Sequence, residues 1–398
     1  MTRVPEQSRI LDRLFSLLAA QPPHVADMTR RGFIANAGKF GLTAAMATSI
    51  TQMFAMPAMA EDVVLPEITS VPEALKGSGE LRYCSYGGAL QEAQRKAYLE
   101  PFQRLTGIKI IESEGPDTAK IKAMVDTGNL EYDLCENDAS SVLNLQRQGD
   151  YFEKIDYSLF DTANIDPKVL QPYYFNMLPY AQIVAYRTDA FDKAPQSNAD
   201  VWDMQAFPGP RALQSGSGGL SPDLEVASMA AGVPASSIYP LDIAKAYESL
   251  AKIKPNVVKW WEAGAMPAQL LSDDEVVMAT AWNGRIDAIQ HAGAPVEILW
   301  KDQLLRNDCW CIPKGAPNKV NALKLSAFMS LAAPQARLSL LIPYGFVNKG
   351  AEALIPADRL KKLPSFSEHA VGMISYDDQW WATNYTDVSN AWAKFILG

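Results

Sequence analysis

Strand-like and helix-like patterns alternate along this chain, and the alternation constrains its fold more than any other feature. Residues 81–86 form an extended apolar run closed by two glycines, and residues 90–105 carry apolar side chains at helical spacing. Strand-like runs at 108–111 and 132–135 follow, with a helical stretch at 118–125 between them. Strands that alternate with helices predict a parallel sheet built from βαβ units, so we expect an α/β fold.

The carboxyl ends of these strands are the first candidate site. In open α/β sheets, ligands bind beyond the carboxyl ends of the strands. Three ends are thereby nominated: Tyr86 with its glycines, Glu114, and residues 136–138. Asp138 is also predicted to be the N-cap of a helix that runs to Arg147.

The second part of the chain continues the pattern less regularly. Residues 178–186 form a long extended run that we expect to leave one lobe and enter another. A Gly/Ser-rich loop at 215–219 precedes a helix that starts near Asp223. Further strands are predicted at 275–281, 296–300 and 309–312, and further helices at 242–253, 319–331 and 334–341.

The first sixty residues resemble an export signal. A twin-arginine pattern at 29–34 precedes a weakly apolar stretch at 40–56 and a small-x-small cleavage site that ends at Ala60. The apolar stretch is short for a membrane-spanning helix. We expect cleavage after Ala60, a tether over 61–78 and a periplasmic mature protein, with Met28 as an alternative start.

The first sixty residues are basic and the remainder of the chain is acidic, and this balance argues against a nucleic-acid partner. The whole chain has 36 basic and 45 acidic residues, a net charge of −9, yet residues 1–60 alone carry six basic and three acidic residues. The remainder therefore has a net charge of −12. Nucleic-acid binding requires clustered Lys and Arg, so the acidic balance argues against it.

Cysteine and histidine usage makes metal and triad chemistry unlikely for this chain. The four cysteines allow three pairings, which the sequence leaves open, and Cys309 and Cys311 are too close for a metal-binding C-x-x-C motif. The two histidines after residue 60, His291 and His369, have no metal-like spacing. We expect no cofactor, no zinc site and no Ser-His-Asp triad.

The order of several short phrases resembles a known family. Those phrases are residues 102–109, 117–133, 178–180, 282–284, 312–318 and 343–348. In this order they are similar to extracellular solute-binding proteins of bacterial ABC importers, in the spermidine/putrescine-binding branch. The resemblance implies a type II periplasmic binding protein fold: two hinge-linked lobes, each a mostly parallel sheet flanked by helices. It also implies a non-enzymatic monomer that delivers a small solute to a permease and an ATPase.

Lobe boundaries and site residues follow from the resemblance. Lobe 1 is expected at 79–178 plus 286–333, and lobe 2 at 179–285 plus 334–398. The resemblance implies a ligand site that contains Tyr86, Asp138, Trp282 and Tyr344, and Asp308 is a further candidate because it directly precedes the strand predicted at 309–312. Aromatic faces and carboxylates suit an ammonium group. The alternatives are a packed tyrosine for Tyr86 and Tyr344, an N-cap for Asp138, and a surface carboxylate for Asp308.

Two departures from the family pattern favour a ligand that also carries a carboxylate. The Gly/Ser loop with Ser217 and Gly218 replaces the acidic pair of the family, and its backbone N–H groups favour an anion. Arg285 follows the Trp-Asn-Gly phrase and suits a carboxylate, although a solvated helix residue is the alternative. Together these residues predict a zwitterionic, amino-acid-like ligand or a polyamine.

Three rival functions remain open. A cysteine-dependent enzyme would use Cys84 or Cys135 with Glu136 or Asp138 as base. A ferric-ion binder would use tyrosines such as the pair at 173–174, and a different solute such as a carboxylate would use the same cleft. A sensor that presents its closed form to a receptor would share the ligand chemistry of a transport protein.

Overall fold

The computed structural model describes residues 64–217, 220–370 and 372–397. The predicted signal over residues 1–60 and its cleavage site lie outside these residues, as does Gly218. Within the described part of the chain, no helix has the length and apolarity that a membrane span requires.

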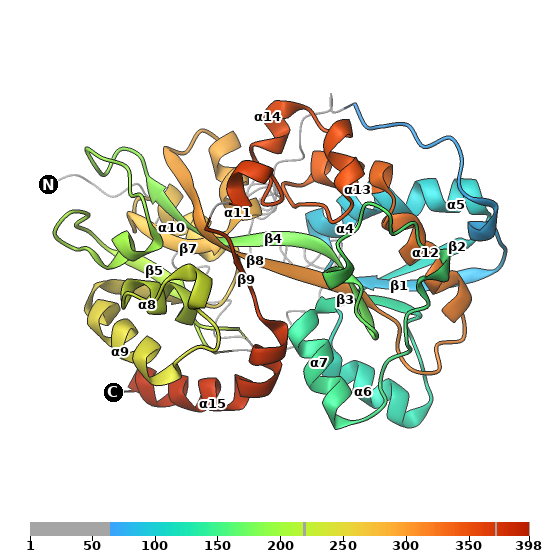
Figure 1. The fold of residues 1–398 in the computed structure, drawn as a ribbon, viewed down its shortest axis with the longest axis horizontal. Helices are drawn as coiled ribbons and strands as arrows, with labels where there is room; N and C mark the ends of the chain where they lie inside the picture. The colour runs from blue at the N-terminus through green and yellow to red at the C-terminus, as the bar shows by residue number, and fades with distance from the viewer. Residues whose placement is uncertain (1–63, 218–219, 371, 398) are drawn as a thin grey trace, which may run out of the picture. The chain divides into compact units, whose positions relative to one another are not determined.

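Nine strands of the described residues join in one mixed sheet (Figure 1). They are β1 (Glu80–Ser85), β2 (Lys109–Glu114), β3 (Leu134–Asp138), β4 (Tyr174–Arg187), β5 (Arg211–Gln214), β6 (Val257–Trp261), β7 (Met278–Trp282), β8 (Val296–Cys311) and β9 (Ile374–Ser375). The order is β2-β1-β3-β8-β4-β7-β5-β6, and β9 pairs with β8. We call β2-β1-β3 the first half of the sheet and β7-β5-β6 the second half.

Helices cover both faces of each half, as the alternating sequence pattern predicts. The longer ones are α4 (Gly88–Gln94), α5 (Glu100–Thr106), α6 (Thr118–Thr127), α7 (Ala139–Gln148), α8 (Leu224–Ala230), α9 (Ile243–Ile253), α10 (Met266–Ser272), α11 (Asn283–His291), α12 (Lys319–Met329), α13 (Ala332–Leu341), α14 (Ala357–Leu360) and α15 (Asp378–Leu397). The short turns are η3 (Glu73–Leu75), η4 (Arg95–Leu99), η5 (Tyr157–Leu159), η6 (Pro167–Val169), η7 (Asn198–Trp202), η8 (Ala235–Ser237), η9 (Lys254–Asn256), η10 (Lys349–Leu354) and η11 (Ser367–Ala370).

Local signals place most helices of the first half where the sequence predicts them. A π-helical turn, η4, joins α4 to α5, so the predicted helix at 90–105 is continuous from 88 to 106. Gly107, with φ of 82°, ends it. Asp117 accepts backbone N–H bonds as the N-cap of α6, and Asp138 does the same for α7. The predicted N-cap at Asp138 is confirmed.

β4 and β8 are the two strands that run through both halves of the sheet, side by side in Figure 1. Their first and last residues pair antiparallel, from Tyr174 with Cys311 to Arg187 with Val296. The sequence predicts two separate strands at 296–300 and 309–312, whereas the structure has one. The polar residues between them pair with β4, and an irregularity in register absorbs Asp302, which has a positive φ of 61°.

Packing differs from the expected lobe boundaries in three places. Ile286, Val296 and Ile298 share a core with Ala181 and Ala279 of the second half, although 286–333 was expected in lobe 1. The physical reason is that the chain changes sides within β8, after α11, rather than before it.

The other two differences concern segments that pack on the first half. Leu338 and Ile342 lie in its core, although 334–398 was expected in lobe 2. Ile68 and Leu75, in the expected tether at 61–78, are buried in the same core. We therefore propose lobe boundaries within β4, within β8 and near residue 366.

Candidate functional site

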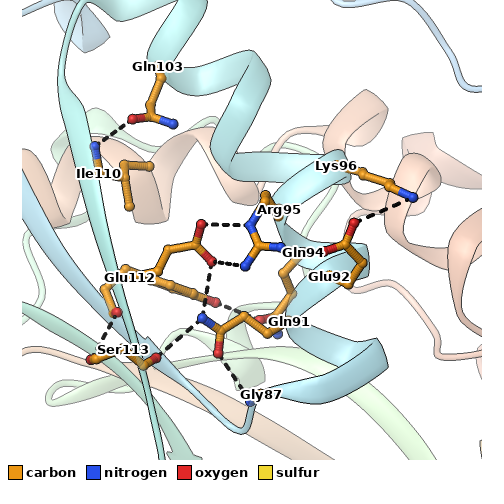
Figure 2. Close-up of polar contacts among 11 residues, drawn as sticks. Gly87, Gln91, Glu92, Gln94, Arg95, Lys96, Gln103, Ile110, Glu112 and Ser113 are labelled. Carbon is orange, nitrogen blue, oxygen red and sulfur yellow. Dashed lines mark hydrogen bonds and ion pairs between the residues drawn. The ribbon is translucent and has the colours of Figure 1, made fainter. Parts of the chain in front are cut away.

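Tyr86 lies directly after β1, on a turn that a polar network holds in place. Figure 2 shows Gln91 at the centre of this network: its Oε1 accepts from the Gly87 N–H at 3.1 Å, and its Nε2 donates to Glu112 Oε2 at 3.1 Å. Arg95 in turn donates to both oxygens of Glu112. Gly87 has a φ of 74°, and a Cβ there would come within 2.6 Å of Glu114 Oε2. The turn thus requires glycine, and it fixes where the Tyr86 side chain starts.

The Tyr86 side chain is 46% exposed, yet it is surrounded by groups from other strands. Loss of hydration raises the pKa of its hydroxyl well above the usual value, and the carboxyls of Asp308, Glu136 and Asp138 raise it further. The Tyr86 hydroxyl is therefore within electrostatic reach of the carboxyls of β3 and β8.

Asp138 and Asp308 lie directly opposite each other in the antiparallel pair of β3 and β8. Asp138 uses both carboxylate oxygens within the protein. Its Oδ1 accepts from the Ser141 N–H at 3.2 Å and from the Ser140 hydroxyl, and its Oδ2 lies 3.3 Å from Arg306 Nη2. Asp138 is therefore both a helix cap and half of an ion pair.

Asp308 has no hydrogen-bond or ion-pair partner in the part of the chain that the structure describes. Burial raises its pKa well above the usual value, and the negative charges of Glu136 and Asp138 raise it further. A carboxylate in such surroundings gains most from a cation that arrives from outside. The side chain of Asp308 is therefore less engaged within the described part of the protein than that of Asp138.

Aromatic side chains from three segments form a wall beside Asp308. The Tyr180 ring lies 6.3 Å from the Trp282 ring and 6.0 Å from the Tyr344 ring, centroid to centroid. Trp282 packs edge-on against Trp261 at 5.6 Å, and its ring covers Gly264, where a Cβ would overlap it. The predicted aromatic residues Trp282 and Tyr344 are thus brought together, and Tyr180 joins them.

Asn283 connects this wall to the turn that carries Arg285. Its Oδ1 accepts from the Ala181 N–H at 2.9 Å, and its Nδ2 donates to the Pro343 carbonyl at 2.6 Å. The Tyr344 ring lies over Gly284, where a Cβ would come within 2.8 Å of it. These contacts explain why the Trp-Asn-Gly phrase and the Pro-Tyr phrase occur together.

Tyr344 is flanked by charges of opposite sign. Burial raises the pKa of Tyr344 to about 12, with the Arg285 guanidinium acting to lower it and the Asp308 and Glu136 carboxyls acting to raise it. A positive charge from α11 and a negative charge from β8 therefore both act on the Tyr344 hydroxyl.

Ser217 is tied to the C-terminal helix rather than to these residues. Its Oγ accepts from Trp392 Nε1 at 3.0 Å, and its N–H donates to Ser215 Oγ at 3.0 Å. The ring of Trp392 also covers Gly216, where a Cβ would approach within 2.7 Å. No described contact brings Ser217 to Arg285 or Asp308.

Sequence reasoning missed Arg306 and Tyr376 as parts of this region, whereas it nominated Glu136 with the carboxyl end of its strand. Glu136 lies two residues before Asp138 on β3, and Arg306 lies two residues before Asp308 on β8. Alternate residues of a strand share a face, so both were within reach of the sequence pattern. Residues 301–308 were not expected to form part of a strand, and this hid Arg306.

The rival chemistries find little support in the described residues. Burial raises the pKa of the Cys84 and Cys309 thiols, which is opposite to what a nucleophile requires. All four cysteines are buried and free. Within the described residues, no three His, Cys, Asp or Glu side chains are arranged to hold a metal ion. Tyr174, of the candidate ferric pair, is buried in the core.

The comparison with known proteins agrees with this fold. Residues 97–367 match the family described as bacterial extracellular solute-binding protein. The chain belongs to this family. A gamma-aminobutyric acid-binding protein of Pseudomonas aeruginosa is 36% identical over 326 residues, which cover 79% of this chain and 91% of the relative.

Two further members extend the comparison. The spermidine/putrescine-binding periplasmic protein of Escherichia coli is 32% identical over 276 residues, covering 65% of this chain and 75% of the relative. The crystal structure of an ABC transporter substrate-binding protein from Bradyrhizobium japonicum gives a TM-score of 0.74 at 35% identity, covering 80% and 99% of the two chains. This solute-binding protein is therefore a component of an ABC importer, and its type II periplasmic binding protein fold is confirmed.

Proposed function

We propose that this solute-binding protein captures a small ω-amino carboxylate such as γ-aminobutyrate. The ammonium group binds Asp308 against the faces of Tyr86 and Tyr344, and the carboxylate binds Arg285. The observation that carries the proposal is that the charges of Arg285 and Asp308 act on the pKa of the Tyr344 hydroxyl in opposite directions. A charge-assisted hydrogen bond at each end and an aromatic wall between them fit a short zwitterion.

A second polar group supports the assignment of the carboxylate end. Trp282 Nε1 is buried and has no hydrogen-bond partner among the described residues. It belongs to the same turn as Arg285, three residues earlier. A buried N–H donor without an acceptor is costly, and a ligand carboxylate would satisfy it. The gamma-aminobutyric acid-binding relative is consistent with this class of ligand.

Polyamines are the second candidate, because the site is rich in carboxyls. The carboxyls of Glu136, Asp138 and Asp378 all act to raise the pKa of Asp308. The spermidine/putrescine-binding relatives share the fold and much of the sequence. The protein acts, in either case, as an exported monomer that passes its solute to a permease and an ATPase, after removal of a twin-arginine signal at Ala60.

A thermal-shift experiment separates the two candidates. At γ-aminobutyrate near 100 times its Kd, ligand binding stabilises the folded state by about 2.7 kcal/mol. Asp308→Asn and Arg285→Met are both expected to abolish this shift, whereas Asp126→Asn on the exposed face of α6 leaves it unchanged. A shift with putrescine or spermidine and none with γ-aminobutyrate would refute the zwitterion assignment.

A further inference from the structure

Arg306 is a buried cation inside the candidate site, and the ligand assignment above gives it no role. It lies on β8 two residues before Asp308, so both side chains point to the same face of the strand. Its partner in the adjacent strand β4 is Tyr180, one of the aromatic residues of the wall. The residue is only 7% exposed.

The surroundings of Arg306 are those of a cation site. The guanidinium carbon lies 4.1 Å from the centroid of the Tyr376 ring and 5.9 Å from that of Tyr180. Asp138 Oδ2 lies 3.3 Å from Nη2. An aromatic face combined with a carboxylate is the usual protein environment of an ammonium or guanidinium ligand.

This environment is built independently of Arg306. The Tyr376 hydroxyl lies 2.7 Å from Ser221 Oγ, and its ring stacks on Trp381 at 5.5 Å with an interplanar angle of 7°. Trp381 Nε1 donates to Glu225 Oε1 at 2.8 Å, which places a second buried carboxyl behind the stack. We call Tyr376, Asp138 and Glu225 the box around the guanidinium. Each of these three side chains is held by contacts that do not involve Arg306.

Arg306 itself is poorly hydrogen-bonded for a buried arginine. Its Nε is buried and has no hydrogen-bond partner in the described part of the chain. Burial acts to lower its pKa, but Tyr180, Tyr376, Asp138 and Glu225 raise it well above the usual value, so the side chain keeps its charge. Arg306 thus acts on its surroundings mainly through its positive charge rather than through hydrogen bonds.

We propose that Arg306 fills a second cation subsite of the ligand cleft and thereby makes the protein select monoamines over diamines. The proposal rests on the proposed function, in which the ligand ammonium binds Asp308. A diamine held at Asp308 would have to place its second ammonium among these aromatic and carboxyl groups, which the guanidinium already occupies, whereas a zwitterion directs its carboxylate to Arg285 and does not use them. Removal of the guanidinium exposes a box of aromatic faces and carboxyls to the second ammonium.

The test compares putrescine and γ-aminobutyrate binding by calorimetry in Arg306→Met, Arg306→Lys and the unaltered protein. Arg306→Met is expected to bind putrescine at least tenfold more tightly than the unaltered protein does. Arg306→Lys keeps the charge and is expected to stay within about threefold of the unaltered protein. Arg187→Met is the matched control, because Arg187 is equally buried and paired with Asp189 and Asp274 away from the site.

Each outcome decides the proposal. It is overturned if Arg306→Met melts cooperatively but gains no putrescine affinity, or if Arg187→Met gains as much. If Arg306→Met does not fold alone, putrescine at 10 mM is expected to restore a cooperative melt, and failure to do so would also overturn it. Failure of the unaltered protein to bind γ-aminobutyrate refutes the proposed function, and the gain of putrescine affinity is measured separately from it.

Discussion

The buried carboxyl of Glu136 makes the stability of the ligand-free protein depend on pH in an unusual direction. The residue is fully buried in β3. Its Oε2 accepts from the Ser85 hydroxyl and from Gln94 Nε2 at 2.8 Å, and its Oε1 has no partner among the described residues. Burial, opposed by these two hydrogen bonds, raises the pKa of Glu136 from 4.5 to about 7.

The sign of the effect follows from proton binding. Because the folded state holds its proton up to a higher pH than the unfolded state, folding takes up a proton between pH 4.5 and 7. The free energy of unfolding therefore falls as the pH rises through this window. At 1.36 kcal/mol per pKa unit, the loss is on the order of 3 kcal/mol.

The isosteric variant Glu136→Gln tests this reasoning, because it keeps the shape and removes the titration. Urea unfolding of the ligand-free protein, followed by tryptophan fluorescence at pH 5, 6, 7 and 8, gives the free energy at each pH. The unaltered protein is expected to lose stability over this range. Glu136→Gln is expected to lose less, with the remaining slope due to the other carboxyls whose pKa burial raises, among them Asp223, raised to about 7, and Asp308.

Glu112→Gln is the matched control, with the opposite sign. Burial acts to raise the pKa of Glu112, but the hydrogen bonds from Arg95 and Gln91 drawn in Figure 2 outweigh it and lower the pKa. Glu112 therefore contributes stability above its unfolded pKa that is lost as the pH falls, and Glu112→Gln should weaken the protein at neutral pH. If Glu136→Gln leaves the pH profile of the unaltered protein unchanged, the buried-proton explanation is wrong.

Three further changes have outcomes set by local contacts. Gly264→Ala places a methyl group against the Trp282 ring and should lower the free energy of unfolding, measured with denaturant, by about 1–3 kcal/mol. An unchanged free energy would show that the Trp282 side chain moves aside without cost. The four buried cysteines should react with a thiol reagent only after denaturation, and labelling of the native protein would contradict their burial. Asp138→Asn should keep the N-cap hydrogen bond of α7 and lose only the ion pair with Arg306, whereas Asp138→Ala should lose both. The alanine variant should therefore be less stable than the asparagine variant by ~1 kcal/mol. Equal free energies of unfolding of the two variants would argue against the cap.

Features with a local cause were predictable from the sequence. The helix that follows Asp138 needs only a capping side chain, an apolar stripe and a glycine at its end, and all three lie within twelve residues. The pairing of the Trp-Asn-Gly and Pro-Tyr phrases was accessible only through the family resemblance. Their physical link, the two hydrogen bonds of Asn283, joins segments sixty or more residues apart.

Features that depend on register between distant strands were not predictable. Residues 301–303 and 306–308 are polar, and Asp302 has a positive φ, so the sequence of this stretch favours a loop. They become part of β8 because β4 supplies partners for their backbone groups. The environment of Arg306 depends on the same register and on Tyr376, seventy residues later. The spacing of residues in the sequence does not predict that Arg306 and Tyr376 are in contact.

The continuity of β8 has a consequence for how this binding protein can change during evolution. The side chains at 306 and 308 sit at alternate positions of one unbroken strand, whose neighbours at 309 to 311 are buried. Three adjacent codons therefore encode both the carboxylate that we propose for the ligand ammonium and the positive charge beside it. On this proposal, a change of ligand preference needs only base substitutions within a nine-nucleotide stretch, with no insertion and no new backbone conformation.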